Sequence, residues 1–264
     1  MKNQRSRAVN TPAAHIVATI IMISMVALIA ACSTAPKPGE NRSAETRTSN
    51  NNSVANTVAT SSGPSTGDLA GTYAITGTGT DGKTYQGDMD VTKRDAVYQL
   101  SWKVGNERYD GIALRNGNTV SAAYTTGTNG KGCGTVIYKI NADGSLDGTW
   151  GEWGVNSAGT EKAIQVGESK GGVGTFDVTG TNADGSPYEG KLTVTQGPND
   201  IYQFKWDTGN TFIGTGVKMG DFLAAGSGAK QCGFVIYEAK GNILEGQWGV
   251  PGSTSLGTEK AVKK

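Results

Sequence analysis

The residues best able to do chemistry in this sequence occur twice, in matching segments. Glu161 and Glu259 each stand in the segment Gly-Thr-Glu-Lys-Ala. A glutamate on the inner face of a strand can accept hydrogen bonds from a tyrosine hydroxyl group or a backbone amide. It can also serve as an acid in a pocket, because burial changes the pKa of a carboxyl group. The structural role is the preferred interpretation.

Two cysteines are also equivalent in the two copies. Cys133 and Cys232 each begin a segment Cys-Gly-x-Val-Ile-Tyr. In an exported protein such a pair can form a disulfide between the copies, provided that the two Cα atoms lie within about 7 Å. The preferred interpretation is two buried free thiols that pack at the start of a central strand, and the disulfide is the alternative.

Most kinds of catalytic and metal site are absent from the sequence. The only histidine is His15, which lies in the N-terminal segment. Without it the chain has no Ser-His-Asp triad and no His-ligated metal site. We find no metal-ligand spacing, no phosphate-binding glycine loop and no nucleophile elbow. We therefore expect no enzymatic activity, no cofactor and no metal, although catalysis by carboxylates alone remains open.

Aromatic residues recur on one face of the alternating segments. A small barrel can fill its interior with such rings or leave a cup for a ligand, and plain core is the preferred interpretation. Trp153 has no counterpart in the second copy, so we expect it to be exposed near a barrel end. The candidate pocket residues are Tyr85, Tyr98, Trp102, Tyr138, Trp150, Tyr188, Tyr202, Trp206, Tyr237 and Trp248.

Residues 1–31 have the pattern of an export signal. Basic residues precede an uncharged apolar run, which is shorter than the ~20 residues that span a bilayer. The run ends Leu-Ile-Ala-Ala-Cys, which resembles the lipobox of bacterial lipoproteins. The resemblance implies cleavage before Cys32 and lipidation of its sulfur and amine, palmitate included. Ser33 at the next position implies sorting to the outer membrane if the bacterium is Gram-negative. An ordinary secretory signal is the alternative.

Residues 32–67 are expected to form a disordered tether after the lipid anchor. The segment is rich in Ser, Thr, Asn, Ala and Pro, and its few apolar residues have no period. Of the 24 basic residues three lie in 1–31, which leaves 21 against 23 acidic ones. With no basic run after the leader, we expect no nucleic-acid partner. The expected partner is the membrane, through the N-terminal lipid.

The rest of the chain is a tandem repeat. We expect one β-domain at 68–166, a linker at 167–172 and a second domain at 173–264. Apolar side chains occupy alternate positions in most segments, which is typical of half-buried strands, and Asp-Gly or Asn-Gly pairs separate them. In the first repeat the expected strands are 71–79, 84–93, 97–104, 108–115, 119–125, 133–141, 145–151 and 159–165.

Eight sequential strands per repeat predict an all-β protein of two tandem antiparallel meanders. Closure into eight-stranded up-and-down barrels of the calycin or avidin kind would remove exposed edges, and β-sandwiches are the alternative. A membrane pore is disfavoured, because Gln86, Asp88 and Asp90 fall on the outward face.

Further motifs are the first-copy segments Gly-Thr-Tyr-x-Ile-x-Gly and Tyr-x-Leu-x-Trp and the repeated segment Leu-x-Gly-x-Trp. Together with the cysteine and glutamate segments above, they resemble small exported bacterial β-proteins that are often labelled fibronectin-binding proteins. The resemblance covers 69–163 and 173–261. It assigns no catalytic residue. The lipobox, the tether and the tandem copies lead us to expect a binding or adhesion module of the cell envelope, which contacts a host or envelope macromolecule such as matrix protein or glycan. Two alternatives stay open: a carrier of a small apolar ligand, and a structural envelope protein.

Overall fold

The computed structural model describes residues 67–126, 129–228 and 232–264. The expected export signal, Cys32 and the tether up to residue 66 lie outside these residues, so their predictions stay predictions. Within the described residues the only helix is a short 3-10 turn, Pro198–Asp200. None of these residues belongs to a helix long and apolar enough to cross a membrane.

In the part of the chain that the structure describes, sixteen strands close into two antiparallel barrels of eight strands each. The first barrel contains β1 (Gly71–Thr78), β2 (Thr84–Arg94), β3 (Val97–Val104), β4 (Glu107–Asn116), β5 (Thr119–Thr126), β14 (Gly233–Lys240), β15 (Ile243–Gly249) and β16 (Gly257–Lys263). The second barrel contains β6 (Cys133–Ile140), β7 (Leu146–Glu152), β8 (Gly159–Lys170), β9 (Val173–Thr181), β10 (Pro187–Gln196), β11 (Ile201–Asp207), β12 (Thr211–Met219) and β13 (Phe222–Gly228). The predicted barrels are confirmed, and the sandwich alternative is wrong.

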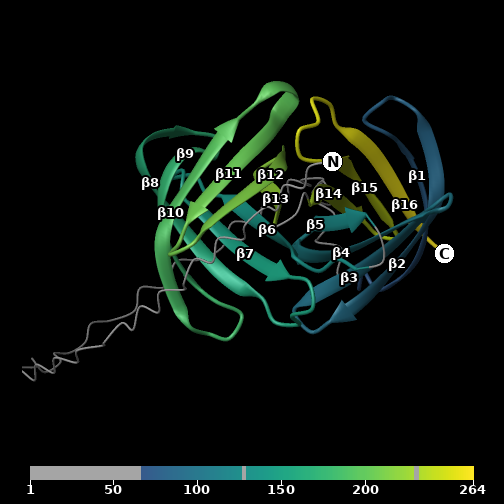
Figure 1. The fold of residues 1–264 in the computed structure, drawn as a ribbon, viewed down its shortest axis with the longest axis horizontal. Coiled ribbons are helices and arrows are strands. Elements are labelled where there is room, and N and C mark those ends of the chain that lie inside the picture. Colours follow the sequence, from purple (N-terminus) through teal and green to yellow (C-terminus); the bar gives the residue numbers. More distant parts are fainter. Residues whose placement is uncertain (1–66, 127–128, 229–231) are drawn as a thin grey trace, which may run out of the picture. The chain divides into compact units, whose positions relative to one another are not determined.

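The two barrels do not coincide with the two repeats. The first five strands of the first repeat close with the last three strands of the second, through the pairing of β5 with β14. The last three strands of the first repeat close with the first five of the second, through β6 and β13. Figure 1 shows this exchange by colour, since the yellow C-terminal strands lie beside the blue N-terminal ones. The expectation that 68–166 and 173–264 each form their own domain is therefore wrong.

The predicted linker at 167–172 is also corrected. Strand β8 continues to Lys170, which pairs with Val173 of β9, so Gly171 and Gly172 form the turn of a hairpin within the second barrel. Both glycines have positive φ, 63° and 89°, a conformation that glycine adopts at little cost. The chain instead passes from one barrel to the other between β5 and β6, and again between β13 and β14.

A buried interface joins the barrels along the exchanged strands. The outer faces of β3 and β4 contribute Val97, Ile112 and Leu114, which pack against Ile137 of β6. A second cluster joins β11–β13 to Phe234 and Ile236 of β14. Strands buried on both faces have continuous apolar runs rather than alternation. This burial explains the segments Val-Ile-Tyr and Phe-Val-Ile-Tyr, which break the period of two.

A disulfide ties the two crossings together. Cys133 begins β6 and Cys232 immediately precedes β14, and the two form a disulfide with their Cα atoms 5.8 Å apart. Both residues are 2% exposed and pack against Ala123. The preferred interpretation of two free thiols is therefore wrong. The interpretation was wrong because the strand exchange brings Cys133 and Cys232 together. Two separate repeats would have kept the two cysteines in separate barrels.

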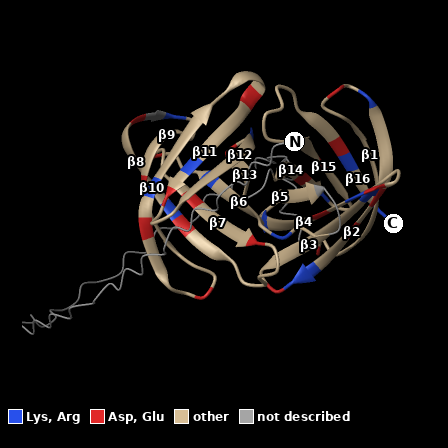
Figure 2. Cartoon of the chain, in the orientation of Figure 1, with Lys and Arg blue, Asp and Glu red and all other residues tan. Residues whose placement is uncertain are grey.

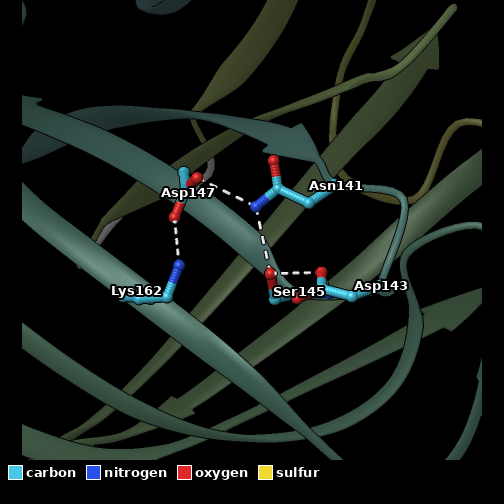
Figure 3. A network of polar contacts seen from close by, with 5 residues as sticks. All are labelled: Asn141, Asp143, Ser145, Asp147 and Lys162. Atoms are coloured by element: carbon cyan, nitrogen blue, oxygen red, sulfur yellow. Dashed lines mark hydrogen bonds and ion pairs between the residues drawn. The ribbon is translucent and has the colours of Figure 1, made fainter. Parts of the chain in front are cut away.

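Side-chain contacts link the turn between β6 and β7 to strand β8. In the turn between β6 and β7, the Asn141 amide donates to the Ser145 hydroxyl (3.0 Å) and to Asp147 (2.9 Å), and Ser145 donates to Asp143 (2.7 Å) (Figure 3). Lys162 of β8 then pairs with Asp147 at 2.8 Å. These contacts hold β7 and β8 in the register that sets Glu161 opposite Gly148.

The charged side chains lie on both barrels with the two signs interspersed, as Figure 2 shows. The ion pairs between them are exposed; Lys191 with Asp177 (2.7 Å) is one example. Such surface pairs contribute about 0–1 kcal/mol each.

Candidate functional site

A carboxylate with aromatic hydrogen-bond donors lies inside the second barrel. Glu161 of β8 is 5% exposed and accepts hydrogen bonds from the hydroxyl groups of Tyr138 and, at 2.9 Å, Tyr188. Trp206 donates its indole N–H to the Tyr138 hydroxyl (2.8 Å), and Trp150 donates to the Tyr188 hydroxyl (3.0 Å). Two tryptophans thus hold two tyrosines, and both tyrosines donate to one glutamate.

The first barrel contains the equivalent cluster. Glu259 of β16 is 7% exposed and accepts hydrogen bonds from Tyr237, from Tyr85 (2.8 Å) and from the indole N–H of Trp102 (3.2 Å). As a result of the strand exchange, Tyr85 and Trp102 come from the first repeat whereas Tyr237 and Glu259 come from the second. Neither cluster is built from one repeat alone.

Burial controls the titration of both clusters. Desolvation raises the pKa of the Glu161 and Glu259 carboxyl groups, and the hydrogen bonds from the tyrosines partly oppose that rise. Desolvation and the adjacent carboxylates also raise the pKa of Tyr138 and Tyr237 well above the usual value. The tyrosines therefore act as protonated donors, which suits a structural or binding role.

A cavity of about 470 Å³ opens beside Glu161 in the second barrel. Its volume falls within the range of about 300–1,000 Å³ that is typical of small-molecule sites. The lining lies near the crossing segments and includes Cys133 and Gly134 at the start of β6, and Ser227 and Gly228 at the end of β13. The aromatic lining residues are Tyr138, Trp150, Trp153, Tyr188, Trp206 and Phe212.

The polar lining of this cavity is acidic or neutral. Two carboxylates, Glu161 and the exposed Glu152, line it together with Asn182, Thr208 and Asn210. Among the described residues that line the cavity, none is Lys, Arg or His. The combination of aromatic faces and hydrogen-bonding groups suits a small organic ligand without a negative charge.

The equivalent space in the first barrel is filled by Tyr124 of β5. Its ring lies near Trp102, Tyr109 and Trp248, with centroid distances of 5.9, 5.8 and 6.5 Å. Tyr124 pairs with Gly233 and Gly111, whereas in the second barrel Ser227 pairs with Gly134 and Gly214. Ser227 is thus the structural equivalent of Tyr124, and the smaller side chain leaves the cavity.

A second depression, about 740 Å³ and more open, lies over β1, β2, β15 and β16 of the first barrel. Tyr85 and Glu259 line it, with Thr76, Gln86 and Glu245. Tyr85 is its only aromatic lining residue among those described. Although it is larger than the cavity of the second barrel, it lacks the enclosing rings, so the smaller cavity is the better candidate site.

The predicted pocket residues separate into three groups. Four of them, Tyr138, Trp150, Tyr188 and Trp206, line the cavity of the second barrel. Of their equivalents in the first barrel, Tyr85, Trp102 and Tyr237 donate hydrogen bonds to Glu259, and Trp248 packs edge-on against Tyr85. Tyr98 and Tyr202 are buried core residues, 9% and 4% exposed, and do not line the cavity.

Trp153 is half-buried rather than exposed, because it packs against the interface cluster of Val97, Ile112 and Leu114 and lines the cavity. Its backbone N–H donates to the Cys133 carbonyl group at 2.9 Å. The sequence-based expectation placed it at a barrel end without foreseeing the neighbouring barrel.

Sequence reasoning missed Ser227, Phe212 and Glu152. A signal for Ser227 was present, since aligning the two repeats sets Tyr124 of Ala-Ala-Tyr against Ser227 of Ala-Gly-Ser near the end of the fifth strand. A large ring replaced by a small residue on an inward face predicts a space. Phe212, 45% exposed, stands opposite Trp206 and aligns with Tyr109 in the same way.

Within the described residues no group of three or more His, Cys, Asp and Glu side chains could hold a metal ion. No family model, no curated protein and no solved structure matches the chain. The candidate site is therefore assigned from its geometry alone.

Proposed function

We propose that this chain is a non-enzymatic binding protein of the bacterial cell envelope, and that it holds a small molecule in the second barrel. The observation that carries the proposal is the cavity of about 470 Å³ beside Glu161. Aromatic walls with a few convergent polar groups are typical of ligand sites in barrel mouths. Of the functions considered from the sequence, the small-ligand carrier is the one that this geometry favours.

The location belongs to the same proposal. The N-terminal segment would be cleaved before Cys32, and the acyl chains would anchor the protein, since lipid burial contributes about 0.8 kcal/mol per CH₂. Labelling cells with an alkyne fatty acid tests this: the wild-type chain would be labelled and a Cys32→Ser chain would not. Label on both chains would contradict lipidation at Cys32.

Adhesion to a host or envelope macromolecule, which we expect from the lipobox, the tether and the tandem copies, stays a prediction. It requires a surface rather than a cavity. Saturable binding of the full chain to matrix proteins or cell-wall glycans would support it, and such binding would be independent of the cavity if it survived a substitution that fills the second barrel.

The carrier proposal is tested by native mass spectrometry of the full chain purified from the cells that make it. A co-purified small molecule, present on the wild type and lost when Ser227→Tyr fills the cavity, would support the proposal. The matched control is Ser227→Ala, which keeps the cavity and should keep the ligand. A wild type that carries no ligand and gains none from an envelope extract would contradict the proposal.

A further inference from the structure

The side chain that fills the first barrel indicates what the second barrel is shaped to hold. Tyr124 places a phenol ring among Trp102, Tyr109 and Trp248. The strand register gives their equivalents in the second barrel as Trp206, Phe212 and Trp150, in the same order. All three line the cavity. The aromatic walls of a ring-binding space are thus present, and the ring that fills this space in the first barrel has no counterpart.

We propose that the second barrel binds a planar aromatic molecule of neutral or positive charge, with its ring at the position that Tyr124 holds in the first barrel. This inference rests on the proposed small-molecule function and adds the chemical class of the ligand. The ring is held by edge and face contacts with its neighbours, which aromatic groups favour at centroid distances of about 4.5–7 Å.

The backbone beside the cavity keeps the space that a flat ring requires. In the first barrel the Tyr124 ring lies against Gly233, where an added Cβ would come within 2.2 Å of the ring. The second barrel has Gly134 at the equivalent position. The nearest atoms to an added Cβ there are the Gly151 carbonyl oxygen at 2.9 Å and atoms of Glu152. A ring can therefore approach the bare backbone of Gly134.

The cavity also offers a hydrogen-bond acceptor for a substituent on that ring. The Tyr124 hydroxyl donates to the Gly249 carbonyl oxygen, at 3.4 Å. The equivalent residue in the second barrel is Gly151, which follows Trp150 as Gly249 follows Trp248, and it lines the cavity. A ligand hydroxyl or amine would find its acceptor there.

The charge of the lining selects against anions. Glu161 and Glu152 line the cavity, and no described lining residue is basic. An anionic ligand would be buried beside a carboxylate with no compensating cation, which is costly in a low-dielectric site. A cationic group instead gains from the carboxylates and from the faces of Trp and Phe rings.

Isothermal titration calorimetry of the full chain tests the inference with three probes that share one phenol ring. They are p-cresol, which is neutral, tyramine, which is cationic, and 4-hydroxyphenylacetate, which is anionic. We expect saturable binding of p-cresol and tyramine at a single site, and binding of 4-hydroxyphenylacetate weaker by about tenfold or more.

Two reciprocal variants locate the site. Ser227→Tyr should abolish binding of p-cresol and tyramine, whereas the matched control Ser227→Ala should retain it. Tyr124→Ser should open the first barrel and raise the stoichiometry to two ligands per chain. Circular dichroism checks that each variant is folded. If Tyr124→Ser does not fold, the Ser227 pair alone carries the test.

The outcomes separate the ligand class from the function. Failure of all three probes to bind at millimolar concentration, binding that survives Ser227→Tyr, or equal affinity for the anion would overturn the inference. If a co-purified aliphatic or sugar ligand is lost in Ser227→Tyr while the phenols fail to bind, the carrier function stands and the aromatic class is wrong. If neither a co-purified ligand nor a phenol binds, both are wrong.

Discussion

The two barrels are built from equivalent strands, and each holds a buried glutamate that accepts hydrogen bonds from two tyrosines, yet the space beside this cluster is filled by a ring in the first barrel and open in the second. In the first barrel Tyr124 occupies the space beside the cluster, and in the second Ser227 stands at the equivalent position. The clusters are therefore not themselves evidence of a ligand. Because the cluster is present in the filled barrel too, its common task is to close and order a barrel.

A duplicated protein can change its function at positions outside the structure that its two halves share. Because of the strand exchange, each cluster contains residues of both repeats. A substitution of one cluster residue therefore removes contacts with strands of the other repeat. Tyr124 and Ser227 instead lie on β5 and β13, next to the crossings. A substitution there changes the filling of one barrel and leaves every strand pair intact.

The largest effect is expected from removal of the disulfide that links the two barrels. Replacing both cysteines, Cys133→Ser with Cys232→Ser, opens a loop of 99 residues between them. The chain-entropy account gives about 4.7 kcal/mol for a loop of roughly 100 residues, as an upper value. We expect urea denaturation to show a large loss in the free energy of unfolding for both barrels together.

The control for this prediction is the wild-type chain under reducing conditions, which should unfold at the same urea concentration as the double variant. Loss of structure in one barrel only, seen by amide hydrogen exchange, would show that the exchanged strands do not couple the barrels.

The second largest effect is expected from removal of the ring that fills the first barrel. Tyr124→Ser removes a ring that packs on Trp102, Tyr109 and Trp248. Truncation of a buried aromatic side chain to Ala costs about 3–5 kcal/mol, and we expect a value near the lower end because Tyr124 is only partly buried. Hydrogen exchange should accelerate most in β3, β4 and β15, the strands that carry the rings packed on Tyr124. Ser227→Ala is the matched control, with little expected change. Equal acceleration in the second barrel would contradict the assignment of Tyr124 to the first barrel's filling.

Much of the architecture could be predicted from the sequence, because the strands are local features. The alternation in Tyr98–Val104 and the turn at Asp143-Gly144 each depend on neighbouring residues, and the structure confirms strands β3, β6 and β7 to within one residue or so. The exchange of strands between repeats could not be predicted in this way. Equivalent strands of the two repeats present nearly the same edge residues, so pairing within a repeat and pairing across repeats have the same local signature. Only the pairing of β5 with β14 and of β13 with β6 distinguishes them.

The candidate site was predictable in part for a similar reason. The inward position of Glu161 and of its tyrosines follows from the period of two, and the structure places them together. The cavity depends on a difference between the repeats, Tyr124 in one and Ser227 in the other. A repeat is recognised by the residues that its copies have in common, so this difference lies outside the pattern that defines the repeat. Trp153 and the disulfide depend on the barrel interface, which no local pattern contains.

The third prediction concerns how the free energy of unfolding depends on pH through the two buried carboxyl groups. The pKa of Glu161 and of Glu259 is raised in the folded state, because burial disfavours the ionised form. The folded state then binds these protons more tightly than the unfolded chain, whose glutamates titrate near pH 4.3. Their contribution is fully present below that pH and is lost as the pH rises through the folded pKa.

Urea denaturation from about pH 4 to about pH 8 measures this dependence. Relative to Glu161→Gln and Glu259→Gln, the wild type should lose stability as the pH rises, since glutamine does not ionise. Bound tyramine should weaken the dependence at Glu161 alone, because a cation in the cavity favours its ionised form. Curves for the wild type and the two variants that run parallel would contradict the raised pKa values.

The smallest effect is expected from Ser227→Tyr, which makes the second barrel resemble the first. Ser227→Tyr places a ring among Trp206, Phe212 and Trp150, and the open backbone at Gly134 allows the ring to approach. Cavity-filling substitutions commonly stabilise by about 0.5–2 kcal/mol, and we expect a gain in that range in the ligand-free chain. The gain should disappear when the wild type is saturated with ligand, because the ligand already stabilises the folded state. A clear loss of stability in the ligand-free chain would show that the space beside Ser227 does not have the shape of the Tyr124 site. The two barrels would then differ at this place by more than one side chain.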